Sequence, residues 1–244
     1  MVRSVVLILA ALAVCVVSAM ATESVSLMTG EDDFSDVLTE RYMARKCRGK
    51  KKYRVEITFN WSGMSHPDAY PEDGQFSPLV AASHSSCYDI WTPACYASKG
   101  VQVVAETGNI KLLLLELKYH LHRNVYDFKF LTKPTEDGTQ TVALDIMVDG
   151  YGGRTLISAI TMIFPSPDWF TGIDNMDTCD QKTGRWRRKI EGNLSAWDAG
   201  TDLGEDFESP NKPNRKYTPI VSILGTRFSG IPLGSYKIYQ IKSY

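Results

Sequence analysis

Apolar and polar residues alternate along several short stretches of this chain, which is the pattern of half-buried β-strands. The clearest stretch runs from Tyr53 to Trp61, where every second side chain is apolar. Other short strand-like stretches cover residues 79–82, 125–131, 141–148, 217–224 and 236–241, and residues 155–164 are expected to form a buried strand. Residues that favour turns separate these stretches. Strands at such short intervals predict an all-β fold with minor α content, built as an antiparallel β-sandwich.

One region, residues 101–122, has helical periodicity instead. Leu112, Leu115, Tyr119 and His122 recur every three to four residues, and Gly108-Asn109 marks the start of the periodic part. Further leucines widen the apolar arc of this segment. A helix with so broad an apolar surface is typical of one packed against a sheet. We therefore expect a single packed helix.

The segment from Phe164 to Pro213 follows neither period and is rich in Asp, Gly, Pro and Trp. Its aromatic residues argue against disorder, so we expect a long ordered loop system laid over the scaffold. Asp168, Asp198 and Asp202 are its candidate ligands, because hard cations such as Ca²⁺ take oxygen ligands from carboxylates, carbonyls and water. On spacing alone, turn formation or helix capping explains these aspartates more simply.

The N-terminus has the layout of a secretory signal peptide. Arg3 precedes an apolar core and small residues that suit cleavage. The apolar core is shorter than the ~20 residues that a membrane span needs, and no other stretch qualifies as a transmembrane segment. We predict a signal peptide at 1–20, a flexible N-terminal arm at 21–44 and one domain at 45–244, secreted from the cell.

The charge is nearly balanced, with 27 basic and 28 acidic residues. This balance gives no overall attraction to nucleic acid, and we expect no nucleic-acid partner. Basic residues are nevertheless concentrated at two places in the chain, one within residues 45–54 and one at residues 185–189. Such clusters suit a sulfated glycosaminoglycan or another acidic matrix partner. A solvated flank beside a strand is the simpler interpretation of the first cluster.

The cysteine count points to an oxidised, exported protein. Cys15 lies in the signal peptide, and the remaining Cys47, Cys87, Cys95 and Cys179 form an even set that predicts two disulfides. Three pairings are open. Cys87 and Cys95 bracket a short loop that a local bridge would staple. A zinc site is disfavoured, because these spacings supply no paired thiolates with histidine partners.

No catalytic arrangement is evident. His84 stands beside two serines, but the chain has no Gly-x-Ser-x-Gly nucleophile elbow and no glycine-rich nucleotide fingerprint. We therefore predict that the protein is not an enzyme. Asn60 and Asn193 each begin an Asn-x-Ser sequon, so both are candidate glycosylation sites in an exported chain.

Three ordered motifs resemble the spondin domain family, found in F-spondin and mindin: Ser-Pro-Asp-Trp-Phe-x-Gly-x-Asp, Trp-Asp-Ala-Gly-Thr-Asp and Glu-Ser-Pro-Asn. The resemblance extends over most of the mature chain and implies an antiparallel sandwich with calcium-binding loops at one end. It implies that Asp168, Asp198 and Asp202 are Ca²⁺ ligands, and it implies a disulfide between Cys47 and Cys179. The family pattern has other residues at the positions of Cys87 and Cys95.

The function that this resemblance implies is a secreted, calcium-binding, non-enzymatic module of the extracellular matrix or of cell adhesion. Its partners would be matrix or cell-surface proteins, and calcium would fix the loops of Trp169 and Trp197 and so create the surface that a partner meets. The alternative is a secreted recognition protein, similar to an innate-immunity lectin, that binds microbial glycan or an anionic membrane through its aromatic loops and basic clusters.

Overall fold

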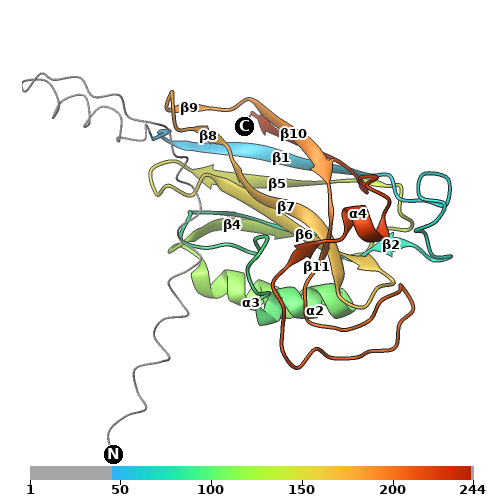
Figure 1. Cartoon of the computed structure of the whole chain (residues 1–244). Coiled ribbons are helices and arrows are strands. Elements are labelled where there is room, and N and C mark those ends of the chain that lie inside the picture. The colour runs from blue at the N-terminus through green and yellow to red at the C-terminus, as the bar shows by residue number, and fades with distance from the viewer. Residues whose placement is uncertain (1–45, 243–244) are drawn as a thin grey trace, which may run out of the picture. The chain divides into compact units, whose positions relative to one another are not determined.

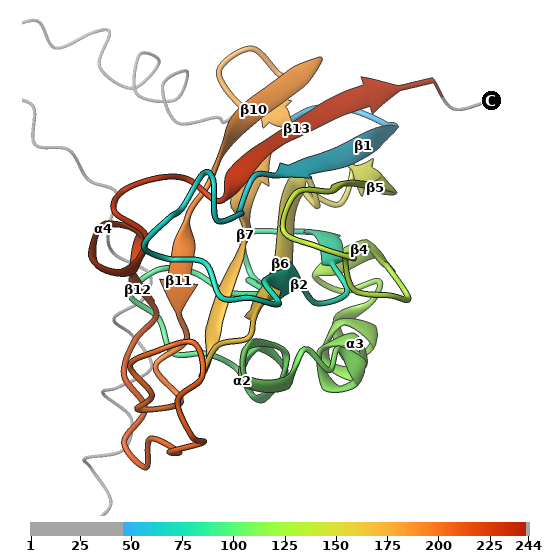
Figure 2. The same ribbon diagram turned by 90° about the vertical axis from the view of Figure 1, so that its right-hand side faces the viewer.

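Two antiparallel sheets packed face to face form the body of the protein, and two helices cover the outer face of the larger sheet (Figures 1 and 2). The structure is a computed structural model that describes residues 46–242. The predicted signal peptide (1–20) and N-terminal arm (21–44) lie outside the described residues. The antiparallel sandwich predicted from the strand pattern is confirmed.

The smaller sheet has the strand order β10-β13-β1-β5. Its strands are β1 (Lys50–Phe59), β5 (Thr141–Asp149), β10 (Lys189–Leu194) and β13 (Gly234–Ile241). Strand β1 is the alternating segment of the sequence, and Val55 lies opposite Ile238 on one side and Leu144 on the other. The apolar positions of this strand are buried, while Arg54 and Glu56 between them are half-exposed.

The larger sheet has the order β12-β11-β7-β6-β3-β4, and β2 also pairs with β6. Its strands are β2 (Gln75–Phe76), β3 (Val80–His84), β4 (Val125–Phe130), β6 (Leu156–Phe164), β7 (Trp169–Asp177), β11 (Ala196–Asp198) and β12 (Val221–Ser222). Strands β6 and β7 lie at its centre. The first five residues of β7 are all buried, because the other sheet covers one face and α2 the other.

The prediction that residues 164–213 form only loops is wrong. This segment contains β7, β10, β11 and a short hairpin of β8 (Cys179–Asp180) and β9 (Arg185–Trp186). A strand buried on both faces loses the alternation of apolar and polar residues by which exposed strands are recognised. The long ordered loop that remains runs from residue 199 to 220.

The smaller sheet, the larger sheet and the helices form three layers, and two sets of buried apolar side chains hold them together. The layer between the sheets includes Tyr53, Val55, Ile57, Ile146, Ile157, Trp169 and Ile238. The layer between the larger sheet and the helices includes Val80, Ile160, Phe170, Val101, Val104, Leu113 and Leu117. The larger sheet is therefore fixed on both faces, and it provides a rigid support for the loops at its ends.

The helical region contains two helices rather than the single one predicted. Helix α2 (Lys99–Thr107) ends at Gly108, whose left-handed backbone (φ 67°) lets its N–H donate to the carbonyl of Val104. Asn109 then accepts a hydrogen bond from the N–H of Lys111 at 3.0 Å, where α3 (Lys111–His120) begins. The predicted start at Gly108-Asn109 is confirmed for α3, and α2 is an addition to the prediction.

The disulfide between Cys47 and Cys179 is present, as the resemblance implied, with the two Cα atoms 5.7 Å apart. The predicted bridge between Cys87 and Cys95 is not formed, because Cys87 is an exposed free thiol. Other contacts fasten the loop between these two residues. The indole N–H of Trp91 donates to the carbonyl of Ala159 at 2.9 Å, which anchors the loop to β6 without a covalent bond.

The strand predicted at residues 217–224 is mostly wrong. Only Val221–Ser222 pairs, as β12, and the short helix α4 (Leu224–Arg227) follows. Between residues 46 and 242, none of the helices has the length and apolar character that a membrane crossing requires.

Candidate functional site

The acidic segment converges on Asp168, which lies immediately before β7 and is fully buried. Its Oδ2 accepts hydrogen bonds from the N–H of Thr201 at 2.7 Å and from the N–H of Asp202 at 3.0 Å. The hydroxyl of Thr201 lies 3.3 Å from the same oxygen. The loop after β11 therefore wraps around one oxygen of this carboxylate.

The other oxygen of Asp168 has no such partner. Oδ1 is buried and accepts no hydrogen bond from any residue that the structure describes. A buried carboxylate oxygen without a donor costs free energy unless the group is protonated or a cation neutralises it. Burial, followed by the negative charge of Asp198, raises the pKa of Asp168 to about 7, against the opposing donors of Thr201 and Asp202.

Asp198 ends β11, where it pairs with Trp169 of β7 and so lies beside Asp168. Its Oδ1 accepts the N–H of Gly200 at 2.7 Å. Burial is the main cause that raises the pKa of Asp198, and the charge of Asp202 adds to it. The indole N–H of Trp169 points its partial positive charge at Asp198 and lowers this pKa, although among residues 46–242 no acceptor lies within full hydrogen-bond geometry of it.

Asp202 has a different position. It is almost completely buried, and both of its carboxylate oxygens accept backbone hydrogen bonds. Oδ1 accepts from Gly204 at 2.7 Å and Oδ2 from Lys212 at 2.8 Å. These bonds close the loop between residues 203 and 212. Asp202 thus shapes the loop, and its charge adds to the negative potential at Asp198.

The local sequence explains why the loop can form. Gly200 has a left-handed backbone (φ +73°), and a Cβ there would lie 2.1 Å from the carbonyl oxygen of Thr218. Only glycine fits that conformation and that contact. The side-chain amide of Asn214 also donates to the carbonyl of Gly200, at 3.1 Å. The Asp-Ala-Gly-Thr-Asp motif is therefore a fixed turn that places the carboxylate of Asp198 and the backbone N–H groups of Thr201 and Asp202 at Asp168.

The fit of this site to a metal ion is partial. Across residues 46–242, no three His, Cys, Asp or Glu side chains are arranged as a ready metal cluster. The unpaired Oδ1 of Asp168 and the carboxylate of Asp198, whose charge acts on Asp168, nevertheless offer oxygen donors only. Such donors suit a hard cation. Asp168 and Asp198 fit this chemistry in their present geometry, whereas the oxygens of Asp202 are already engaged.

The two tryptophans expected on the partner-facing surface do not lie there. Trp169 is buried against Phe207 and Phe228, and Trp197 is half-buried against Trp91. The large apolar side chains that this loop exposes are Leu203 and Tyr217, with exposed fractions of 48% and 39%.

The histidine beside the serine pair has a structural position. His84 is fully buried, and its ring nitrogens lie 3.0 Å from the carbonyl of Ser85 and 2.9 Å from the hydroxyl of Ser158. A buried ring that is engaged on both sides is typical of a packed polar contact.

A second polar cluster, which the sequence did not indicate, lies at the far end of β7. Asn175 has a left-handed backbone (φ 50°) and a buried Oδ1 without a hydrogen-bond partner among the described residues. Its amide donates to Asp89 and Thr92. Burial raises the pKa of the neighbouring Asp174 to about 6. In the sequence this cluster is indicated only by the pair Asp174-Asn175, which lies in a segment that was predicted to be a loop.

Comparison with known proteins identifies the family. The Spondin_N family model matches residues 51–229, and the chain therefore belongs to the Spondin_N family. Over 204 residues it is 35% identical to Spondin-1 of Rattus norvegicus, covering 79% of this chain and 25% of that protein. Over 170 residues it is 35% identical to Spondin-2 of Homo sapiens, covering 67% of this chain and 50% of that protein.

A third relative, Spondin-2 of Rattus norvegicus, is 34% identical over 213 residues, which cover 85% of this chain and 60% of that protein. The chain thus spans between a quarter and three fifths of the length of these curated relatives. The matched region includes β1 to β12 and all three aspartates of the acidic loop.

Proposed function

We propose that this protein is a secreted, calcium-binding adhesion module of the extracellular matrix or cell surface, without enzymatic activity. Membership of the Spondin_N family supports the matrix and adhesion role. The predicted signal peptide supports secretion. The disulfide between Cys47 and Cys179 agrees with an oxidising compartment. The partners would be matrix or cell-surface proteins.

The observation that carries the calcium proposal is the unpaired, buried Oδ1 of Asp168 beside the carboxylate of Asp198. Asp168 and Asp198 would hold the ion, and Asp202 would complete the site after a local shift of its carboxylate. A bound calcium ion supplies two positive charges, which offset the cost of burying these acids close together. The carboxylates of Asp168 and Asp202 already position the loop backbone around that point.

The consequence for adhesion follows from the loop. Asp168 and Asp202 bind the backbone of residues 201–212, and Leu203 lies exposed between their contacts. Repulsion between unneutralised acids would loosen this loop, and neutralisation would fix Leu203 and Tyr217 in one arrangement. A rigid surface binds with less loss of conformational entropy. Calcium therefore acts on adhesion through the order of the loop.

A cell-attachment assay on immobilised mature protein tests this function. We expect cells to attach to the native chain, and we expect Asp198→Ala to reduce attachment and calcium affinity together. Asp174→Asn is the matched control, because Asp174 is also a partly buried acid but lies within β7 and outside the loop. Attachment no better than to albumin would contradict the adhesion role. Full attachment with Asp198→Ala would contradict only the calcium role.

We also propose that Asn60 and Asn193 carry glycans. Both side chains are exposed, Asn60 directly after β1 and Asn193 on the edge strand β10. Exposure of the acceptor amide is what modification requires. Peptide mass spectrometry after glycosidase treatment in heavy-oxygen water should show Asp at both positions with the isotopic label.

A further inference from the structure

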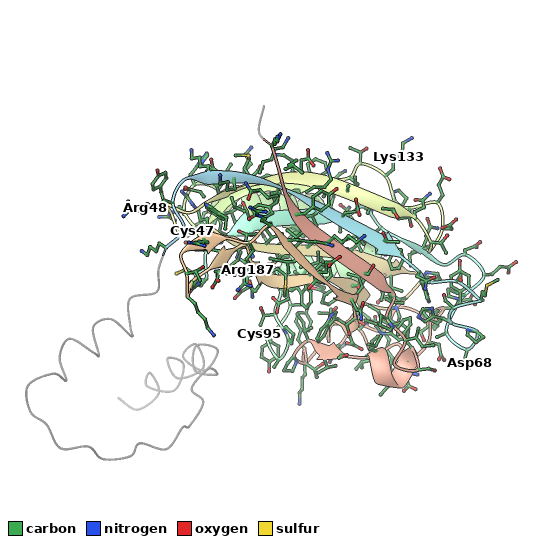
Figure 3. The ribbon with its side chains drawn as sticks, turned by 90° about the horizontal axis from the view of Figure 1, so that it is seen from above. Cys47, Arg48, Asp68, Cys95, Lys133 and Arg187 are labelled. Carbon is green, nitrogen blue, oxygen red and sulfur yellow. A yellow bond between two sulfur atoms is a disulfide. The ribbon has the colours of Figure 1, made fainter. Side chains whose placement is uncertain are left out.

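The two basic clusters of the sequence, far apart in the chain, are neighbours in the structure. The disulfide between Cys47 and Cys179 joins residues 132 positions apart. The indole N–H of Trp186 in β9 also donates to the carbonyl of Arg48 at 3.0 Å. Arg48 and Arg187 accordingly lie at one end of the molecule, away from Lys133 and Asp68 (Figure 3).

Between these clusters the surface is hollowed. The hollow has a volume of about 630 Å³ and is lined by Lys46, Arg48, Thr183, Gly184, Arg185 and Trp186. We call this site the basic hollow. Its three cations come from both clusters, and all three are exposed. Arg187 and Arg188 extend the positive surface beyond its rim and are exposed as well.

No ion pair among residues 46–242 neutralises the cations of the basic hollow. The ion pairs within residues 46–242 engage Lys52 and Arg54 with Asp145, Lys129 with Asp127, Arg154 with Asp149, and Lys189 with Glu191. None of them includes a residue that lines the hollow. Free, clustered cations on a fixed surface repel one another, and a polyanion that binds them removes this repulsion.

Two acids of this region, Asp177 and Asp180, are engaged by the hairpin. Asp180 accepts hydrogen bonds from the N–H of Lys182 at 3.0 Å and the hydroxyl of Thr183 at 2.9 Å. Asp177 accepts from the N–H of Cys179 at 2.8 Å. These carboxylates stabilise the turn between β8 and β9. The hollow keeps its net positive charge because its own walls carry no acid.

We infer that the basic hollow binds a sulfated glycosaminoglycan chain. Arginine presents a planar fork of donors that matches the paired oxygens of sulfate and carboxylate groups. Two arginines and a lysine around one hollow suit a polymer that repeats such groups along its length. The disulfide and the Trp186 contact hold both walls in place, so little order is lost when the polymer binds.

A concave site also discriminates between polyanions. A recessed set of cations meets a flat anionic membrane less fully than a flexible chain, and the one apolar side chain of the lining, Trp186, is held by its hydrogen bond to the carbonyl of Arg48. A narrow, flexible saccharide chain can follow the hollow. This inference concerns a surface separate from the acidic loop and does not depend on the calcium proposal, although both would serve attachment to matrix.

The test is the affinity of the full mature chain for immobilised heparin at physiological salt. The triple variant Lys46→Gln, Arg48→Gln, Arg185→Gln removes the charge of the hollow. We expect its Kd to rise about tenfold or more, with a weaker dependence of log Kd on log salt. The control variant Lys111→Gln, Lys118→Gln, Lys133→Gln removes the same charge elsewhere and should stay within about twofold of the native chain.

Three further arms make the result decisive. Heparin stripped of sulfate but keeping its carboxylates should bind far less well, and chelator should leave heparin binding unchanged. Equal losses in the two triple variants would overturn the site, because net charge alone would then explain binding. Equally tight binding to phosphatidylserine vesicles or to single-stranded DNA, lost in the same hollow variant, would overturn the sulfated saccharide. Melting curves of both variants verify that each is folded.

Discussion

Replacing Asp168 by asparagine should stabilise the calcium-free protein and abolish its response to calcium. Asp168→Asn keeps an oxygen that can accept the hydrogen bonds of Thr201 and Asp202, and it removes the buried negative charge. Removal of a hydrogen-bonded buried acid would ordinarily destabilise a protein. Here the opposite sign is expected in chelator, because the second oxygen is unpaired and lies beside Asp198.

The magnitude follows from the pKa of Asp168, which burial and Asp198 raise from 3.8 to about 7. Well below pH 3.8 the carboxyl group of Asp168 is protonated in both the folded and the unfolded state, and its contribution to stability is fully present. As the pH rises from about 4 to 7, the unfolded chain releases this proton first, and the contribution is lost. Each pKa unit corresponds to about 1.4 kcal/mol, so the loss approaches about 4 kcal/mol above pH 7.

Chemical denaturation between pH 4 and 8, with chelator and with millimolar calcium, measures these effects. The native chain in chelator should lose stability across this window, and Asp168→Asn should lose much less. At pH 8 the variant should be the more stable protein in chelator, and calcium should stabilise only the native chain. Bound calcium favours the ionised carboxylate and should flatten the native profile.

Asp174→Asn is the control on the same strand. Burial raises the pKa of Asp174 to about 6, so this variant should also weaken the pH dependence while it keeps the full response to calcium. The reasoning is refuted if Asp168→Asn is the less stable protein in chelator at pH 8. It is also refuted if calcium stabilises this variant as much as it stabilises the native chain.

Three other predictions concern the scaffold. Replacing Cys47 and Cys179 by serine removes a link between residues 132 positions apart. Denaturant unfolding should show that the unfolding free energy falls by about 5 kcal/mol, as the chain-entropy model gives. A fall of less than about 1 kcal/mol would contradict this prediction. Gly108→Ala places a Cβ 2.9 Å from Cβ of Ser77 at a left-handed backbone position. This variant should lower the unfolding free energy by about 1–2 kcal/mol. Unchanged stability would contradict the left-handed conformation of Gly108. In the folded, unreduced protein a maleimide should label Cys87, the exposed thiol, and mass spectrometry that finds Cys87 bridged to Cys95 would contradict the structure.

The sequence predicted the strands with one exposed face from their alternation, and it predicted the buried strand β6 from its continuous apolar run. In β1 the solvent-facing side chains of Arg54 and Glu56 alternate with buried Val55, and that contrast carries the signal. Strand β7 gives no such contrast, because Trp169 and Phe170 are both buried, on opposite faces of one sheet. The elements that cover β7 come from distant parts of the chain, so no local sequence pattern could indicate that β7 is a central strand.

The motifs predicted which residues belong to the candidate site but not how these residues are arranged. The motifs named Asp168, Asp198 and Asp202, but hydrogen bonds made between residues 33 and 34 positions apart decide which oxygens remain unpaired. The same limit explains the error at Trp169, which packs on Phe207 and Phe228 from other parts of the chain. Proximity in sequence also favoured a bridge between Cys87 and Cys95, whereas Trp91 anchors that loop to β6.

The most direct test of the account is a calorimetric titration of the mature, oxidised chain with calcium after removal of bound metal. We predict one site, lost in Asp198→Ala, with a melting temperature that rises as calcium saturates it. An absence of binding at millimolar calcium would contradict the account. The unpaired oxygen of Asp168 would then be a protonated carboxyl group in a metal-free Spondin_N fold.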